Sequence, residues 1–317
     1  QTLGEAIFSQ LKEHAPYGGV VPEIGSRAHI EQIWHVTRAA FLNAKLLAKD
    51  IDVVAATFAP GLLGPLLVGA QFAKGFSLAR SIALIAVHHI EGHIFSGLGD
   101  KDFPKAPFLA LIASGGHTAI YLVAENHEIK MIGETLDDAA GEAFDKIGRA
   151  LSLSYPAGKE MDELASLGDA QRYKFPIALE HHAGYDFSFS GLKTRALLAI
   201  QKQKTFSKQD LADFCASFRE AVAKALVKRS LKACHDLGIT SLVLGGGVSA
   251  NSRLRDLLSQ SLPAGHQLYL PPKKYCTDNA SMIAKAAIIR LRQGRFSDYS
   301  LDACASLPIE KAHILTR

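Results

Sequence analysis

Residues Phe108–Val123 read F-L-A-L-I-A-S-G-G-H-T-A-I-Y-L-V, two apolar runs on either side of a glycine-containing turn. This pattern predicts a hairpin formed by strands Phe108–Ala113 and Ala119–Val123. Glycines at the tip let an anion approach the main-chain N–H groups, and Ser114 and His117 add polar contacts. A plain structural turn is the alternative interpretation of the same pattern.

A second glycine turn lies in Leu242–Leu254, L-V-L-G-G-G-V-S-A-N-S-R-L. A strand ends in three glycines, and a helix is then predicted with Ser249 as its N-cap. The N–H groups and positive dipole end of such a helix favour an anionic ligand. The motif is not G-x-G-x-x-G, so a Rossmann dinucleotide site is not predicted. Two such turns favour a bound nucleotide, although both could be structural.

Strand and helix patterns alternate along most of the chain, which predicts an α/β fold. The other predicted strands are Ile51–Phe58, Ile82–Val87, Ile129–Ile132, Ser241–Leu244 and Gln267–Leu270. The predicted helices are Ile30–Ala48, Leu66–Ala79, Asp137–Leu151, Lys208–Leu237 and Asn279–Gln293. The stretch Gly99–Pro107, which contains glycine and prolines, is predicted to join two lobes.

The composition is that of an ordinary globular protein, with 317 residues, 48% of them hydrophobic and 21% charged. No apolar run is long enough to span a membrane, and nothing at the start resembles a signal peptide. The four cysteines lack C-x-x-C spacing. This argues against a zinc ribbon or a disulfide scaffold and predicts reduced thiols in the cytoplasm. The formal charge of +4 permits an anionic partner such as RNA without requiring one.

Residues 88–93, H-H-I-E-G-H, are the main candidate for a metal site. His89 and His93 are four residues apart, so on a helix they point within about 40° of each other and can share one metal ion. Glu91 lies about 200° around the helix from His89. It is therefore poorly placed to act as the base of an H-E-x-x-H metalloprotease. Surface or packing histidines are the alternative interpretation.

A metal ion needs a third protein ligand, and the best candidate is Asp278 in Y-C-T-D-N-A. Asp278 could instead cap the helix that follows. A run of carboxylates lies elsewhere, where Asp138, Glu142 and Asp145 share one predicted helix face. Such a face is usually solvated, but beside a glycine turn it could also accept hydrogen bonds from ribose hydroxyls.

Eight motifs together closely resemble the tRNA N6-adenosine threonylcarbamoyltransferase family, over about Tyr17 to Ala284. They are Y-G-G-V-V-P-E-I-G-S-R, P-G-L-L-G-P-L-L-V-G, H-H-I-E-G-H, S-G-G-H-T, D-D-A-A-G-E-A-F-D-K, F-S-F-S-G-L-K-T, G-G-G-V-S-A-N and C-T-D-N-A. The H-H-x-E-G-H form resembles the bacterial and organellar branch of the family.

The resemblance implies the two-lobed, actin-like ATPase fold that is shared with sugar kinases and heat-shock chaperones. We expect residues 1–107 to form the N-terminal lobe, completed by about 290–317, and residues 108–289 to form the C-terminal lobe. The family opens with a strand and an E-T-S-C-D loop that faces the nucleotide phosphates, and this chain starts after it. The resemblance therefore implies that this segment is either disordered or deleted.

The resemblance also implies a reaction. A threonylcarbamoyl group would pass from threonylcarbamoyl-AMP to N6 of the adenosine just after the anticodon, in tRNAs that read codons beginning with A. One divalent ion, iron or zinc, would be held by His89, His93 and Asp278. The threonylcarbamoyl-AMP or adenine nucleotide in the cleft would be held by Ala113, Ser114, Gly115, Gly116, His117, Asp145, Gly158, Asp162 and Asn251. The sequence does not identify a general base, and His117 is our candidate for that role.

The implied partners are tRNA, an inactive actin-like paralogue that forms a heterodimer, a P-loop ATPase, and the synthase that supplies threonylcarbamoyl-AMP; a homodimer is the alternative assembly. Two substitutions depart from the family pattern. Ala113 replaces the usual valine, and Ala157 replaces the first glycine of P-G-G, which predicts a change in how closely the backbone approaches the ligand. A metalloprotease and a non-catalytic scaffold of the same complex are the competing functions.

Overall fold

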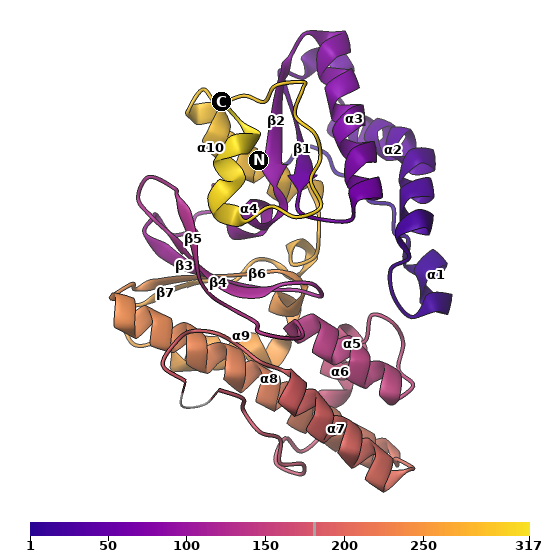
Figure 1. Cartoon of the computed structure of the whole chain (residues 1–317), viewed down its shortest axis with the longest axis vertical. Helices are drawn as coiled ribbons and strands as arrows, with labels where there is room; N and C mark the ends of the chain where they lie inside the picture. Colours follow the sequence, from indigo (N-terminus) through magenta and orange to yellow (C-terminus); the bar gives the residue numbers. More distant parts are fainter. Residues whose placement is uncertain (180–181) are drawn as a thin grey trace. The chain divides into compact units, whose positions relative to one another are not determined.

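The computed structural model describes residues 1–179 and 182–317 (Figure 1). Its strands are β1 (Val53–Ala59), β2 (Ala83–His88), β3 (Phe108–Ala113), β4 (Thr118–Val123), β5 (Ile129–Glu134), β6 (Ser241–Gly245) and β7 (Gln267–Tyr269). Its α-helices are α1 (Leu11–His14), α2 (Pro22–Ala44), α3 (Leu63–Arg80), α4 (His89–Ile94), α5 (Ala140–Ala150), α6 (Gly158–Ala165), α7 (Ser190–Gln203), α8 (Lys208–Leu237), α9 (Ser252–Ser261) and α10 (Ala280–Arg292). Short 3-10 turns include Gly247–Ala250 and Ile309–Leu315.

The chain divides into two compact units. Unit 1 contains Gln1–Lys101 and Asp278–Arg317, and unit 2 is the intervening segment Asp102–Thr277. The first boundary between the units, at residues 101 and 102, falls inside the predicted junction. The second, at residues 277 and 278, differs from the expected boundary near residue 290, because α10 packs on α4, β1 and β2 of unit 1. Asp278, which lies two residues before α10, belongs to unit 1.

Unit 2 is built on a five-stranded sheet in the order β5-β4-β3-β6-β7 (Figure 1). β3 pairs antiparallel with β4 and parallel with β6, so the sheet changes from antiparallel to parallel pairing at this strand. Leu109, Leu111 and Ala113 alternate along β3 and are fully buried in one core cluster with residues of α5 and α8. The predicted hairpin is therefore confirmed, and its first strand, β3, is the central strand of this sheet.

Unit 1 contains the parallel pair β1 and β2. Its core cluster joins Phe58, Leu84 and Ala86 of these strands to Ala70 of α3 and to Leu315 near the C-terminus. The C-terminal segment thus packs in the same unit as residues from the first third of the chain. Parallel strands require a crossover connection, which α3 provides here.

All seven predicted strands are present, and α8 has the predicted bounds. The start predicted for the first long helix at Ile30 is wrong, because α2 begins at Pro22, which supplies the fixed φ favoured in a first helical turn. That helix ends at Ala44, where Lys45 takes a left-handed conformation. Helices α6 and α7 were not predicted. No helix among the described residues is both long and apolar enough to cross a membrane.

Candidate functional site

The histidine motif begins at the junction of β2 and α4. His88 is the N-cap of α4, where its ring nitrogen Nδ1 accepts a hydrogen bond from the Ile90 amide at 3.2 Å. The Glu91 carboxylate accepts from the His88 amide, also at 3.2 Å, which completes a capping box. No role was predicted for His88, although the glutamate three residues further along stands at the spacing of a capping box.

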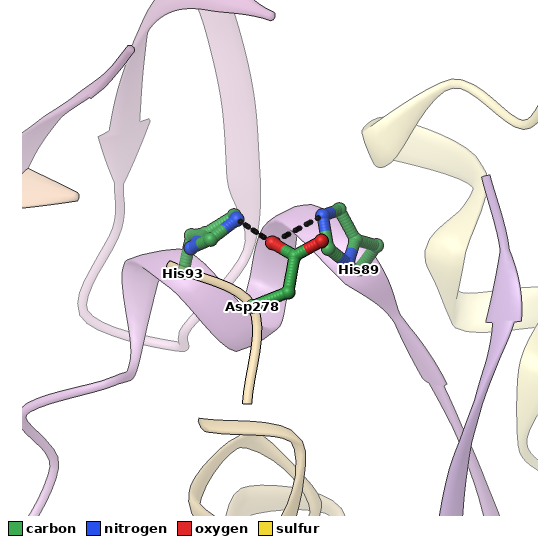
Figure 2. A group of neighbouring side chains, drawn as sticks. All are labelled: His89, His93 and Asp278. Carbon is green, nitrogen blue, oxygen red and sulfur yellow. Dashed lines mark ion pairs between the residues drawn. The ribbon is translucent and has the colours of Figure 1, made fainter. Parts of the chain in front are cut away.

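The structure brings His89, His93 and Asp278 together (Figure 2). Nε2 of His93 lies 3.2 Å from Oδ1 of Asp278, and Nε2 of His89 lies 3.5 Å from the same oxygen. The two imidazole rings are 4.8 Å apart, centroid to centroid. Figure 2 shows both rings on α4 pointing toward the carboxylate, which comes from the segment before α10. The predicted helical spacing of the histidines is thus realised.

These three side chains suit a divalent metal ion. Candidate ligand atoms of all three lie within 4.8 Å of one another. Nε2 of His93 is buried, and apart from its 3.2 Å contact with Oδ1 of Asp278 it makes no hydrogen bond to the described residues. A buried polar atom of this kind suits a bond to a further group such as a metal ion. Asp278 does not cap α10, because Asn279 does so by accepting from the Met282 amide at 2.9 Å. Two imidazoles and a carboxylate are also a donor set that iron and zinc both accept.

Glu91 lies away from the three candidate ligands, as its position on the helix predicted. Its carboxylate accepts a hydrogen bond from the guanidinium of Arg290 at 2.5 Å, in an ion pair that is largely buried. A glutamate held in this way is unsuited to act as a general base. The geometry therefore argues against the metalloprotease alternative.

The two glycine turns lie at neighbouring strand ends of unit 2. β3 and β6 run parallel with Ile112 opposite Gly245, so their carboxyl ends coincide. Gly246 has φ +85°, and a Cβ on it would lie only 2.4 Å from the carbonyl oxygen of Ala113. Only glycine satisfies both the conformation and the space at this position. Ligands in open α/β sheets commonly bind at such carboxyl ends.

The turn after β3 is closed by its own polar groups. The Ser114 amide donates to the His117 carbonyl at 2.7 Å, and Ser114 Oγ accepts from the His117 amide at 3.1 Å. Gly115 and Gly116 are exposed, and a Cβ on either would meet no atom within 4 Å. This open space is what the close approach of a ligand to the main chain requires.

Helix α5 begins against the same turn. The Gly141 amide donates to the Ser114 carbonyl at 3.1 Å, and a Cβ at Gly141 would lie 2.6 Å from that oxygen. The Ala140 amide donates to the Thr118 hydroxyl at 2.9 Å. The start of α5 is therefore fixed to the turn by contacts that leave no room for a larger side chain.

The remaining predicted nucleoside contacts are tied to the ends of helices. Asp145 on α5 accepts from the Ala157 amide at 2.9 Å, directly before α6. Burial raises the pKa of Asp145, and this hydrogen bond offsets the rise only in part. Asn251 is buried and caps α9 through the Leu254 amide at 3.0 Å, so the predicted Ser249 cap is wrong. The reason is that a 3-10 turn separates the glycines from α9.

Asp162 is held by two residues that the sequence analysis missed. Arg219 of α8 donates to its carboxylate at 2.9 Å, and the Ser252 amide and hydroxyl donate at 3.1 and 3.0 Å. These contacts join α6, α8 and α9 at one point. No sequence spacing predicts such a meeting, since the partners are far apart along the chain.

Asp138 and Glu142 do not form a free carboxylate face. Lys146 contacts Asp138 at 2.7 Å and Glu142 at 2.8 Å, and Lys193 of α7 also pairs with Asp138. Of the three carboxylates considered for ribose, these two are engaged with lysines. The motif F-S-F-S-G-L-K-T leads into α7, which begins at its Ser190 and packs on α5.

The Ala157 substitution falls on the buried side of its segment. Ala157 is 1% exposed, and its methyl group lies where Gly148 has no side chain, since a Cβ at Gly148 would be 2.1 Å away. The adjacent Gly158 has open space around it. The methyl group of Ala157 therefore packs against Gly148 in the core of unit 2, and the space around Gly158 stays open.

Comparison with solved structures shows the class of fold. The chain is similar to HypF from T. kodakarensis, with a TM-score of 0.61 and 13% identity over 83% of this chain and 44% of that longer one. Full-length HypF in a phosphate- and nucleotide-bound form gives a TM-score of 0.55 with 18% identity, over 83% of this chain and 41% of that one. This likeness confirms the predicted α/β fold of the actin-like ATPases.

Sequence comparison shows the family. The family model described as tRNA N6-adenosine threonylcarbamoyltransferase matches residues 1–285. Proteins of that name from Caldicellulosiruptor saccharolyticus and Thermosipho africanus are 44% and 43% identical, over 96% and 97% of this chain and 90% and 93% of theirs. One from Magnetococcus marinus is 45% identical over 96% of this chain and 88% of its own. The chain belongs to the tRNA N6-adenosine threonylcarbamoyltransferase family.

Proposed function

We propose that this protein transfers a threonylcarbamoyl group from threonylcarbamoyl-AMP to N6 of the adenosine that follows the anticodon, in tRNAs reading codons that begin with A. Relatives over 40% identical along nearly the whole chain carry the name of this activity. The structural observation that carries the proposal is the convergence of His89, His93 and Asp278, which a metal-assisted acyl transfer would use. A non-catalytic scaffold would have no need of these three side chains.

The same three residues would hold one divalent ion, iron or zinc. Bound there, the ion would polarise the carbamoyl carbonyl and stabilise the charge that develops on its oxygen. The pair of histidines on one helix sets the spacing of two ligands. The buried position of His93, 2% exposed at its side chain, restricts its freedom to turn away.

Unit 2 would hold the adenylate. The open main chain of Gly115 and Gly116, with Ala113, Ser114 and His117, would face its charged part. Asp145, Gly158, Asp162 and Asn251 would hold its nucleoside. The hydrogen bonds that fix Asp162 and Asn251 favour this role because they orient the side chains before a ligand arrives. His117 is exposed and stays our candidate for the general base.

We infer that the two units are the two actin-like lobes, and that the protein works in the cytoplasm. Its partners would be the tRNA substrate, an inactive actin-like paralogue, a P-loop ATPase and the synthase that makes threonylcarbamoyl-AMP. A homodimer is the alternative to the heterodimer. Mass measurement of the purified protein, alone and mixed with the paralogue, distinguishes the two assemblies.

Reconstitution tests the function. The protein and its partners would be incubated with threonine, bicarbonate, ATP, the synthase and unmodified tRNA, and the tRNA nucleosides analysed by mass spectrometry. We expect threonylcarbamoyladenosine with the intact protein and none with Asp278→Ala. Unmodified adenosine in the complete reaction, with a related enzyme active in parallel, would remove the transferase assignment.

A further inference from the structure

The helix that carries the two histidines is fastened to α10 along its whole length. Arg290 contacts the beginning of α4, Met282 and Ile283 lie against its middle, and Lys285 contacts the segment just after its end. These residues lie on the helix that Asp278 precedes. The relative position of α4 and α10 therefore sets the distance between the carboxylate and the two imidazoles.

At the beginning of α4, Arg290 makes the most extensive set of contacts. Its guanidinium donates to Glu91 at 2.5 Å, to the Ala86 carbonyl of β2 at 3.1 Å and to the Ala312 carbonyl at 3.1 Å. It is 5% exposed. Because Glu91 also accepts from the His88 amide, one carboxylate links the cap of α4 to α10. A planar guanidinium with several fixed donors resists displacement better than an ammonium group would.

In the middle of α4, Gly92 allows the two helices to approach closely. A Cβ on Gly92 would lie 2.7 Å from Cδ1 of Ile283 and 3.2 Å from Cγ of Met282. His93 directly follows Gly92, so a change in this spacing moves a candidate ligand directly. Gly92 thus fixes how far α4 stands from α10.

After the end of α4, Lys285 supplies the third attachment. Its ammonium group donates to the Ser96 carbonyl at 2.8 Å and to the Asp100 carboxylate at 3.0 Å. Attachments at both ends and a close contact between them leave α4 little freedom to slide or rotate on α10. Sliding or rotation would change the distances from Nε2 of His89 and His93 to Asp278.

We propose that Glu91, Gly92, Arg290 and Lys285 are positioning residues that hold α4 on α10 and so preorganise His89, His93 and Asp278 for a divalent ion. This inference rests on the proposed metal site and deepens it. Within H-H-I-E-G-H it assigns this role to Glu91 and Gly92, and His88 caps the same helix. Glu91 and Gly92 hold α4 in position on α10, while His89 and His93 would bind the metal ion.

The test is the affinity of the full chain for Zn²⁺, measured by competition with a chromogenic chelator well below the unfolding temperature. We expect Glu91→Gln and Arg290→Lys each to bind one Zn²⁺ about tenfold more weakly than the wild type, as loss of supporting contacts around a metal site does. The double variant should be no weaker than the weaker single variant, because both remove the same contact. Lys285→Met should weaken binding less, since its contacts are more exposed.

Glu220→Gln is the matched control. Glu220 forms an ion pair with Arg253 in unit 2, at 2.5 and 3.0 Å, and its side chain is as buried as that of Glu91. This variant should lose stability without any change in Zn²⁺ affinity. Wild-type affinity in Glu91→Gln, Arg290→Lys and Lys285→Met would overturn the positioning role while leaving the metal site intact. If the wild type itself bound no Zn²⁺, the metal site would be lost, and the positioning role with it.

Discussion

The candidate sites of the two units are formed by different kinds of group, side chains in one and main chain in the other. In unit 1, three side chains converge, and each is placed by other side chains such as Glu91 and Arg290. In unit 2, main chain at two glycine turns is the main feature, exposed at Gly115 and Gly116, and it is placed by close backbone contacts such as Gly246 on Ala113. The first kind of site is vulnerable to the loss of a side chain, and the second to the addition of one.

The largest effect is expected from removing a ligand in unit 1. His93→Ala should weaken binding of Zn²⁺ by about 100-fold or more, because a site with two protein ligands binds much more weakly than one with three. Metal content after dialysis measures this. His35→Ala, an exposed histidine of α2, is the control and should retain wild-type metal. Full metal content in His93→Ala would show that the ion is held elsewhere.

The next effect is expected from adding a methyl group in unit 2. Gly246→Ala should lower the free energy of unfolding by about 2–4 kcal/mol, because it combines a positive φ with a backbone clash. Gly247→Ala is the matched control, since no atom would lie within 4 Å of the new Cβ. Chemical denaturation of both variants measures the difference. Equal stability would mean that the approach of Gly246 to Ala113 is not as close as described.

A smaller effect is expected where the added methyl group meets only solvent. Gly115→Ala should leave the unfolding free energy within about 0.5 kcal/mol of the wild type. If the turn approaches an adenylate, the same change should weaken binding of a non-hydrolysable adenylate analogue about tenfold, or about 1.4 kcal/mol. Calorimetric titration measures it. Unchanged binding would argue that the turn is purely structural.

The smallest effect is expected from Asp138, and it depends on pH. Burial acts to raise its pKa, but the hydrogen bonds and charges of Lys146 and Lys193 outweigh this and hold the pKa below 3.8. The carboxylate therefore stabilises the fold above about pH 4, and this contribution is lost as pH falls through the lowered pKa. Asp138→Asn should cost about 1 kcal/mol at pH 7. The difference from the wild type should shrink below pH 3.8, and a constant difference would exclude this origin.

Much of the fold follows from local patterns in the sequence. The apolar runs predict the seven strands of the described residues, and α8 has the bounds that were predicted for it. Errors fall where another feature overrides the pattern. A 3-10 turn moves the cap of α9 from Ser249 to Asn251, and Pro22 starts α2 eight residues before its clear apolar periodicity.

Less of the candidate sites could be predicted. Helical spacing identifies His89 with His93 and excludes Glu91. No spacing rule links Asp278 to the histidines, so it was a candidate that only the family resemblance joined to them. The partners Arg290 of Glu91 and Arg219 of Asp162 were missed for the same reason. These contacts join segments that only the tertiary fold brings together, so they leave no periodic signal.

The insertion of unit 2 within unit 1 has a consequence for synthesis. His89 and His93 leave the ribosome before any of unit 2, whereas Asp278 follows only after the whole of it. Arg290, which fastens α4, emerges later still. A nascent chain therefore cannot assemble the three-residue site until the inserted unit has been translated. Under the proposed function, the three-ligand site can bind its metal ion only late in synthesis. Metal bound at this site therefore distinguishes chains translated through Asp278 from shorter ones.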